Sequence, residues 1–312
     1  MAIFPASGVV STIDRPNVLA RTLESLLYQD DQARELIIID ASGDNRSRDI
    51  IAARKAEFGA RGCRLLWERA VVVGAAAQRN QGVARATQNF IWFFDDDIIF
   101  EPFCLRRLCV ALDSDPGLGG VSAMITNQRY QAPGHISRAM FRLMAGKPQA
   151  SYAGCVLGPA VNLLPEDRAD LPNVVSVEWL NTTCTLYRRS ALPLPPFPSQ
   201  FSGYSLMEDV CLSVTVARKW RLANVREARI FHDSQWGLHK ADLAESERMK
   251  LVNRHYVMTS VLGRNRICDY LKLALWQLFG FVGSATQGPT ALGAALRGTF
   301  RGIRDIARSR AQ

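Results

Sequence analysis

The sequence lacks the cysteine and histidine patterns of a metal-binding or disulfide-linked protein. Its seven cysteines are an odd number, and none lies in a CxxC pair or in a Cys/His cluster with the spacing of metal ligands. The N-terminal stretch MAIFPASGVVST has no basic segment followed by a long apolar one, so it does not resemble a secretion signal. Internal repeats and low-complexity tracts are also absent from the sequence. Together these absences favour a reduced, cytoplasmic chain.

The composition is that of a folded globular protein. With 312 residues, of which 48% are hydrophobic and 21% charged, the chain is long enough and apolar enough to bury a core. A formal net charge of +9 would suit RNA, anionic lipid headgroups or phosphorylated small molecules, so it does not choose among them. Residues 1–250 contain no basic patch interleaved with aromatic residues, which argues against nucleic-acid binding.

Most of the positive charge lies at the end of the chain. Residues 251–312 carry nine lysines and arginines against two aspartates, a net charge of +7, which leaves only +2 for residues 1–250. Because the positive charge is concentrated in this segment, it indicates where the protein is located in the cell more than which substrate it acts on. We expect a peripheral position on the cytoplasmic face of an anionic membrane.

The C-terminal segment is predicted to form amphipathic helices. No charged residue occurs between Leu273 and Leu296, but Gln277 and the Gly288–Pro289 pair suit a bilayer-spanning helix poorly. Farther on, an apolar stripe and a basic stripe run side by side at helical spacing, which fits a helix lying among lipid headgroups. The apolar stripe is Leu296, Phe300, Ile303 and Ala307, and the basic stripe is Arg297, Arg301, Arg304 and Arg308. Helices packed on the rest of the protein or on a second copy, and a true span, remain as alternatives.

The first half of the chain predicts an α/β fold. Short apolar runs alternate with helix-like segments, a pattern typical of a Rossmann-like, doubly wound and mostly parallel sheet with helices on both faces. The expected strands are 8–13, 35–40, 63–68, 90–94, 174–180 and 221–232, the last as a strand pair or one bent strand. The expected helices are 16–28, 47–58, 75–86, 103–113, 207–220 and 242–258. Between 119 and 205 the periodicity weakens, so loops are expected to dominate there.

Three adjacent aspartates stand in the most informative string, IWFFDDDIIFEP. Asp95, Asp96 and Asp97 follow five apolar residues at the expected carboxyl end of a buried strand, where open α/β sheets bind ligands. Adjacent carboxylates repel one another unless they are solvated or neutralised by a cation. Alternate residues of an extended segment point the same way, so Asp95 and Asp97 can share one Mg²⁺ or Mn²⁺ that bridges to a diphosphate. A solvated strand end is the alternative.

Five elements in fixed order resemble the family 2 glycosyltransferases of GT-A fold. They are GVVSTIDRP from residue 8, IIIDASGD around residue 40, QRNQGVARA before the aspartates, the aspartates themselves, and EDVCLSVTVARKW followed by ARIFH. The resemblance covers roughly residues 7–235. It implies a GT-A catalytic domain over residues 1–240, with a nucleotide-sugar half at 1–115 and an acceptor half at 116–240. The C-terminal helical, membrane-associating segment would then span 241–312.

The resemblance also implies which residues bind the donor. The nucleotide would be bound by Thr12, Asp14, Arg15 and Asp40. Arg79 and Asn80 would lie beside the diphosphate or support the base pocket. Asp95 and Asp96 complete the donor site, with Asp96 contacting the donor sugar or the ribose. Relatives often have a second acid after the position of Asp40, whereas Ala41 and Ser42 follow here, so the donor base stays open. Ordinary turn, cap or exposed-helix roles are the alternatives for Asp14, Asp40 and Arg79.

The metal site implied by the resemblance consists of Asp95, Asp97 and His232. An imidazole nitrogen beside two carboxylates is acceptable to Mn²⁺. Because a lone histidine at a strand end is often structural, that role remains an alternative for His232.

The catalytic pair implied by the resemblance is Glu208 and Asp209, at the start of a helix. Carboxylates there also stabilise the exposed N–H groups and the helix dipole. In the family pattern Asp209 is the general base that takes the proton of the acceptor hydroxyl, and Glu208 is the alternative. Direct displacement inverts the anomeric carbon. Acceptor contacts are expected from Trp179, Asn181 and Tyr204, although Trp179 and Tyr204 would also suit a core.

The predicted function is therefore metal-dependent, inverting transfer of a sugar from a nucleotide-diphosphate sugar, with a UDP-sugar favoured. The expected acceptor is a saccharide or a lipid-linked saccharide, and a homo-oligomer stays open. A nucleotidyltransferase of similar fold would carry a basic, glycine-rich N-terminal phosphate loop, whereas GVVSTIDRP has one glycine and one arginine. A non-catalytic basic protein that binds lipid or nucleic acid is the other alternative.

Overall fold

A mixed, mostly parallel sheet forms the centre of the computed structural model, which describes residues 2–201, 203, 205–234 and 242–309. Among these residues, nine strands join in the order β3-β2-β1-β4-β10-β6-β11-β5, with β9 paired to β11. The strands are β1 (Ile3–Thr12), β2 (Gln32–Asp40), β3 (Arg64–Arg69), β4 (Phe90–Phe94), β5 (Ile98–Phe100), β6 (Leu118–Ile125), β9 (Val174–Val177), β10 (Cys184–Arg188) and β11 (Arg221–His232). Strands β7 (Val156–Leu157) and β8 (Val161–Asn162) form a separate small pair.

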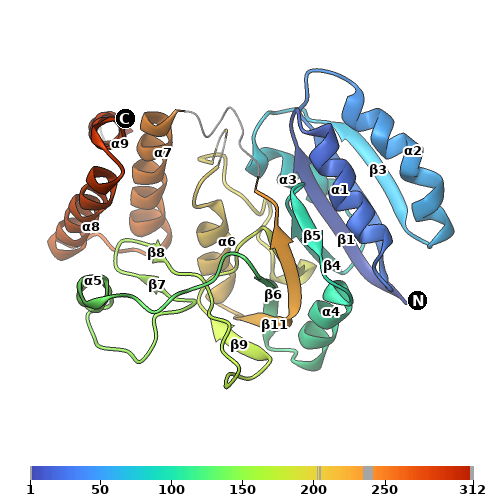
Figure 1. Ribbon diagram of the computed structural model, residues 1–312, viewed down its shortest axis with the longest axis horizontal. Helices are drawn as coiled ribbons and strands as arrows, with labels where there is room; N and C mark the ends of the chain where they lie inside the picture. Colours follow the sequence, from blue (N-terminus) through green and yellow to red (C-terminus); the bar gives the residue numbers. More distant parts are fainter. Residues whose placement is uncertain (1, 202, 204, 235–241, 310–312) are drawn as a thin grey trace.

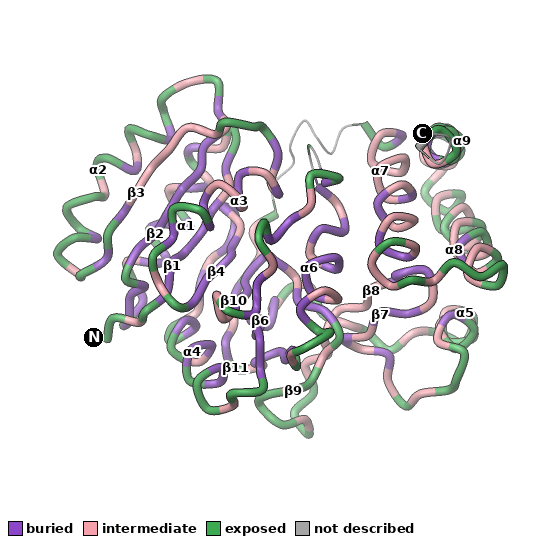
Figure 2. Tube along the Cα trace, turned by 180° about the vertical axis from the view of Figure 1, so that it is seen from behind, coloured by how far each residue is buried: buried purple, intermediate pink, exposed green. Residues whose placement is uncertain are grey.

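Helices cover both faces of this sheet, as predicted (Figure 1). One face packs against α1 (Pro16–Leu27), α2 (Arg46–Ala60) and α4 (Cys104–Ser114), and the other against α3 (Ala75–Arg85) and α6 (Glu208–Ala217). Strand β2 is buried along nearly its whole length because both of its faces are covered, which explains its unbroken apolar run. Figure 2 shows this buried sheet beside the exposed outer sides of the helices.

Several strands depart from the sequence-based expectation, and β5, β6, β7 and β8 were not predicted. Strand β1 begins at Ile3 instead of residue 8, because the chain already pairs with Gln32 and Ala33 before a register shift that contains Pro5. Strand β10 was not predicted, although it lies at the centre of the sheet, antiparallel to both β4 and β6. Residues 221–232 form one bent strand, one of the two predicted alternatives, with a register shift between Val225 and Arg229.

The last part of the chain is helical. Helices α7 (Leu243–Tyr256), α8 (Ile267–Thr286) and α9 (Pro289–Ser309) lie together at one end of the molecule, opposite α2, and α5 (His135–Ala145) lies near α8 (Figure 1). The uncharged run from Leu273 to Leu296 is divided between α8 and α9 by a turn at Gly288, whose φ is +113°. Within the described ranges, none of the helices has the length and apolar character needed to cross a bilayer.

Candidate active site

A pocket of about 490 Å³ opens at the carboxyl ends of β1 and β4. Its walls come from the start of α3, the segment that leads into β10, and the first turn of α6. The sequence-predicted residues that line it are Thr12, Arg15, Arg79, Asp95, Asp96, Asp97, Asn181, Glu208, Asp209 and His232. Most of the predicted donor, metal and catalytic side chains therefore meet in one place.

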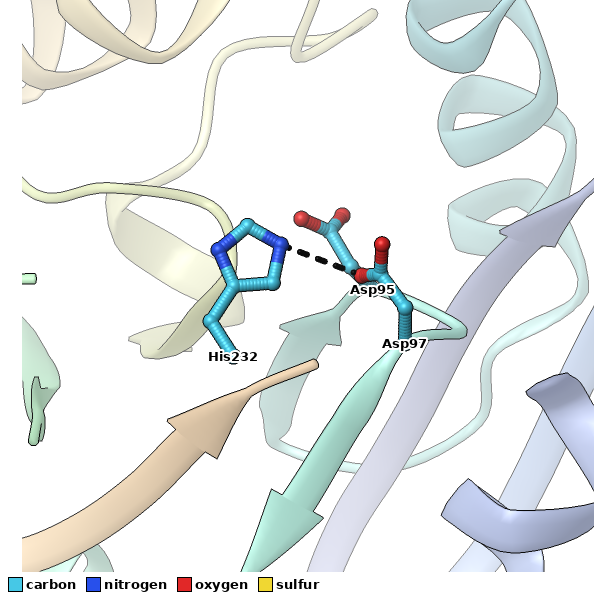
Figure 3. Close-up of side chains that lie close together, drawn as sticks. All are labelled: Asp95, Asp97 and His232. Atoms are coloured by element: carbon cyan, nitrogen blue, oxygen red, sulfur yellow. Dashed lines mark ion pairs between the residues drawn. The ribbon is translucent and has the colours of Figure 1, made fainter. Parts of the chain in front are cut away.

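Two carboxylates and an imidazole converge on one side of this pocket (Figure 3). Asp95, Asp97 and His232 each offer one ligand atom, and the three atoms lie within 4.8 Å of one another. The pairing of β11 with β5 brings them together, because His232 is in register with Ile98, the residue after Asp97. His232 Nε2 lies 3.2 Å from Asp97 Oδ1. Burial acts to raise the pKa of Asp97, but the interactions with His232 and Arg15 outweigh burial and hold this pKa below the ordinary value.

Asp96 does not belong to this cluster and is fully buried. It accepts a hydrogen bond of 2.5 Å from the hydroxyl of Thr12 and another from the guanidinium of Arg15. Burial raises the pKa of Asp96 to about 7, although Arg15 and Thr12 act to lower it. Arg15 also donates to Asp97 Oδ2 at 3.0 Å. Thr12 and Arg15, predicted as donor residues, thus support the aspartates at the end of β4.

Arg79 links the metal-type cluster to Glu208, one of the two carboxylates predicted to be catalytic. Its side chain is buried, with Nη2 donating to Asp95 Oδ1 and Nη1 donating to Glu208 Oε1, both at 2.8 Å. Burial acts to lower the pKa of Arg79, but the two carboxylates outweigh it and the pKa is raised. The guanidinium is therefore a fixed positive charge between the end of β4 and the start of α6.

Glu208 and Asp209 enter the pocket from a sharp turn. Met207, just before α6, has a left-handed φ of +75°, an uncommon conformation for a non-glycine residue. Burial raises the pKa of Glu208, which is paired with Arg79, and also raises the pKa of Asp209, to about 6. Asp209 Oδ1 accepts a hydrogen bond of 2.7 Å from the N–H of Val210 in its own helix. Of the two carboxylates, Asp209 is the one without an arginine in hydrogen-bond contact.

Two predicted nucleotide residues lie outside the pocket lining. Asp14 Oδ1 accepts from the N–H of Gly43, and the backbone N–H of Asp14 donates to Ser42 Oγ. Asp40 is fully buried and accepts from the N–H of Ser42 and from the indole of Trp67. Asp14 thus ties the loop after β1 to the loop after β2, and Asp40 ties the end of β2 to β3. The contact of both carboxylates with a nucleotide stays a prediction.

Two further predicted residues are also occupied elsewhere. The side chain of Asn80 exchanges two hydrogen bonds with the backbone of Phe197. Trp179 is buried in the core, and its indole N–H donates to the carbonyl of Leu163 at 2.8 Å. Asn181 does line the pocket, whereas Tyr204 falls outside the described residues.

Gln78 and Ser205 are pocket residues that the sequence analysis did not single out. The Gln78 amide donates to the carbonyls of Thr12 and Ile39, so it joins the ends of β1 and β2 to α3. Its signal in the sequence is its place directly before Arg79. Ser205 is buried with a φ of +56°, and its hydroxyl accepts from the N–H of Ala76. Nothing local in the sequence indicates this contact, which joins positions far apart in the chain.

Comparisons with known proteins agree with this geometry. Residues 7–153 match the model of glycosyl transferase family 2. Among solved structures, the chain is similar to the mannosyltransferase PcManGT from Pyrobaculum calidifontis in complex with GDP-Man and Mn²⁺. The TM-score is 0.58 at 13% identity, and the match covers 96% of this chain and 87% of that one. No curated protein matches the sequence.

Two other solved structures share the fold. S. aureus TarS 1–349 in complex with UDP-GlcNAc gives a TM-score of 0.52 at 15% identity, covering 80% of this chain and 66% of that one. GalNAc-T7 with UDP, GalNAc and Mn²⁺ gives a TM-score of 0.56 at 13% identity, and the match covers 81% of this chain and 47% of that one. Residues 7–153 thus match glycosyl transferase family 2, and the chain as a whole shares the GT-A fold of these solved structures.

Proposed function

We propose that the protein transfers a sugar, with inversion, from a nucleotide-diphosphate sugar to a hydroxyl group of a saccharide or lipid-linked saccharide. The observation that supports this most is the shared pocket, in which Asp95, Asp97 and His232 lie on one side and Asp209 on another, with the buried cation of Arg79 between them. Such an arrangement separates the group that handles the leaving diphosphate from the group that handles the acceptor proton.

The residues around Asp97 suit a divalent cation. Two carboxylates and an imidazole within 4.8 Å of one another are an oxygen-and-nitrogen ligand set that Mn²⁺ accepts and Mg²⁺ tolerates. A cation bound there would neutralise the negative charge of the diphosphate leaving group. Arg15, which donates to Asp96 and Asp97 and also lines the pocket, would add a second positive charge beside that diphosphate.

Asp209 is the proposed general base. Its carboxylate lines the pocket, and its raised pKa still leaves it ionised at neutral pH, so it can accept a proton from an acceptor hydroxyl. The acceptor oxygen then forms a bond to the anomeric carbon while the bond from that carbon to the diphosphate oxygen breaks, and the electron pair leaves with the diphosphate. Glu208 is less suited, because Arg79 holds its carboxylate.

The donor is proposed to be a UDP-sugar, and similar folds bind both uridine and guanosine nucleotides, as UDP-GlcNAc and GDP-Man. The test is thermal unfolding with UDP, GDP, CDP or ADP in the presence of Mn²⁺, followed by turnover of the sugar nucleotides of the base that stabilises most. We expect the largest stabilisation with UDP and its loss on adding EDTA. If no nucleotide diphosphate stabilises the protein, the proposed reaction is wrong. Stabilisation by GDP alone would replace only the donor base.

A further inference from the structure

We propose that the outer faces of α8 and α9 form a docking surface for an anionic lipid bilayer, on which the protein lies without crossing the membrane. This docking surface consists of the exposed apolar side chains of both helices together with the arginine stripe of α9. These residues are Ile267, Leu271, Leu278 and Val282 on α8, Leu296, Phe300 and Ile303 on α9, and Arg297, Arg301, Arg304 and Arg308. This surface is separate from the pocket described above.

Helix α9 packs inward with its small residues. Ala294, Ala295, Gly298 and Gly302 are buried, and a Cβ atom added at Gly298 would come within 2.3 Å of the carbonyl oxygen of Ala244 in α7. The two helices therefore approach closely at a glycine, and no large side chain of α9 can take that place. This contact fixes which side of α9 faces the protein and which side faces outward.

The large apolar residues of α9 face outward as a consequence. Successive residues of a helix are turned by about 100°, so Leu296, Phe300 and Ile303 share one side, roughly opposite Gly298. Phe300 is 63% exposed and Ile303 is 56% exposed. A helix that served only to close the core would turn these side chains inward. Their exposure indicates that something other than this chain covers them.

Helix α8 adds a second exposed apolar stripe. Ile267, Leu271, Leu278 and Val282 recur at helical spacing, and each is more than half exposed. Gln277 of α8 donates to the hydroxyl of Thr299 in α9, so the two helices pack against each other. No charged residue stands between Leu273 and Leu296, so the turn that joins the two helices brings no charge into the apolar area.

In the described part of the chain, the arginines of α9 pair with no carboxylate. Arg297, Arg301, Arg304 and Arg308 are exposed and form no ion pair with any carboxylate in the described ranges 2–201, 203, 205–234 and 242–309. Asp305, the acidic residue of α9, is already paired with Arg248 of α7. At about 100° per residue, the four arginines lie along one border of the exposed apolar side. Phosphate groups beside an apolar layer complement this pattern.

A bilayer fits this surface better than a second copy of the chain does. A two-fold contact places the same patch of both subunits together, so each arginine stripe would meet the docking surface of the second copy, whose residues named above include no carboxylate. Headgroup phosphates supply the missing negative charge, and the acyl boundary accepts the leucine, isoleucine and phenylalanine side chains.

Docking would place the pocket close to the membrane. Asn253 of α7, the helix on which α9 packs, donates to the carbonyl of Leu206 at 2.8 Å, and Leu206 lines the pocket. One helix thus separates the docking surface from the wall that carries Glu208 and Asp209. An acceptor held in the membrane would be reached from this position.

The test is co-sedimentation of the full chain with vesicles of phosphatidylcholine alone or of phosphatidylcholine and phosphatidylglycerol in equal parts. We expect tight, salt-sensitive binding to the anionic vesicles. The variant R297Q/R301Q/R304Q/R308Q should bind them at least about a hundredfold more weakly, since each basic residue contributes to attraction by anionic lipid. The variant L296S/F300S/I303S should lose binding to both kinds of vesicle, while circular dichroism shows unchanged helix content.

The matched control is R34Q/R48Q/R54Q/R85Q, which removes the same charge from the half of the molecule that carries α2. It should bind within about threefold of the wild type, because α2 lies at the end of the molecule opposite α8 and α9 (Figure 1) and salt screens the attraction between distant charges. An equal loss in this control would show that net charge alone attracts the protein and would overturn the proposed surface. The absence of vesicle binding would also overturn the proposal. A dimer that L296S/F300S/I303S converts to a monomer would assign these helices to subunit contact instead.

Discussion

Arginine has opposite surroundings in two regions of this molecule. In the pocket, Arg79 is buried and its two terminal nitrogens face Asp95 and Glu208. On α9, four arginines stand in solvent without a carboxylate partner among the residues described. A buried cation must be paired, because leaving it unpaired in a low-dielectric environment is unfavourable, whereas an exposed one is free to meet an external anion. The pocket charges therefore hold the protein's own groups in place, and the α9 charges face a partner.

Replacing the proposed base should have the largest effect on the pocket side of this comparison. Asp209→Asn should lower kcat/KM by about a thousandfold, since asparagine cannot accept the hydroxyl proton and a positioned base contributes about 10²–10⁴-fold. Melting temperature should hold or rise, because the variant removes a carboxylate whose pKa burial has raised. Steady-state transfer rates and thermal unfolding measure the two effects. Full activity in Asp209→Asn together with inactive Glu208→Gln would move the base to Glu208.

Removing the buried cation should come next in size. Arg79→Gln leaves Asp95 and Glu208 without their common partner and should reduce the free energy of unfolding by about 3 kcal/mol, at the lower end for a broken buried pair. The lower end applies because Glu208, with its raised pKa, can take up a proton. Arg85→Gln is the control on the same helix. Arg85 is 60% exposed and paired with Glu68, so its loss should stay within about 1 kcal/mol in urea unfolding. Equal losses would contradict the bridging role of Arg79.

The pH dependence of transfer should show a smaller, graded effect. A general base acts in its ionised form, and burial raises the pKa of Asp209 to about 6. Activity should therefore be complete above this value and fall about tenfold per pH unit as the pH drops below it. The measurement is kcat/KM against pH at saturating Mn²⁺, with donor affinity measured over the same range to separate protonation of the metal-type cluster. A profile that stays flat down to the ordinary aspartate range would contradict the environment assigned to Asp209.

The sequence predicted the pocket better than it predicted the pocket's internal contacts. Buried strands such as Phe90–Phe94 have a local apolar signature, so Asp95 and Asp97 could be expected together at a strand end, and the family resemblance implied His232 beside them. The partner of Arg79 on the far side, Glu208, is 129 residues away. No local pattern reports such a contact, and the guanidinium of Arg79 meets carboxylates where a phosphate was expected.

Side chains with a choice of partners were also beyond prediction. Asn80 could have faced a diphosphate, but the chain near Phe197 offers its backbone N–H and carbonyl at the right spacing. Strand β10 was not predicted because its sequence, CTLYR, is short and ends in arginine. Its threonine and tyrosine suit a strand but do not predict one in the absence of its neighbours β4 and β6. On α9 the stripes were visible in the sequence, but only the contact of Gly298 with α7 shows that both stripes face outward.

The smallest expected effect belongs to the exposed arginines, and it sharpens the contrast with Arg79. The variant R297Q/R301Q/R304Q/R308Q removes like charges three or four residues apart, which favours the helix by about 0.2–0.5 kcal/mol per pair. It also removes cations from the last turns of α9, where they stabilise the helix dipole by about 0.3–1 kcal/mol. These opposing contributions nearly cancel, so the free energy of unfolding without lipid should change by less than about 0.5 kcal/mol. Urea unfolding measures it, with Arg248→Gln as the paired control, since Arg248 contacts both Glu245 and Asp305. A loss as large as that of Arg79→Gln would mean that the α9 arginines hold the fold together, and their charge would then no longer be available for a bilayer.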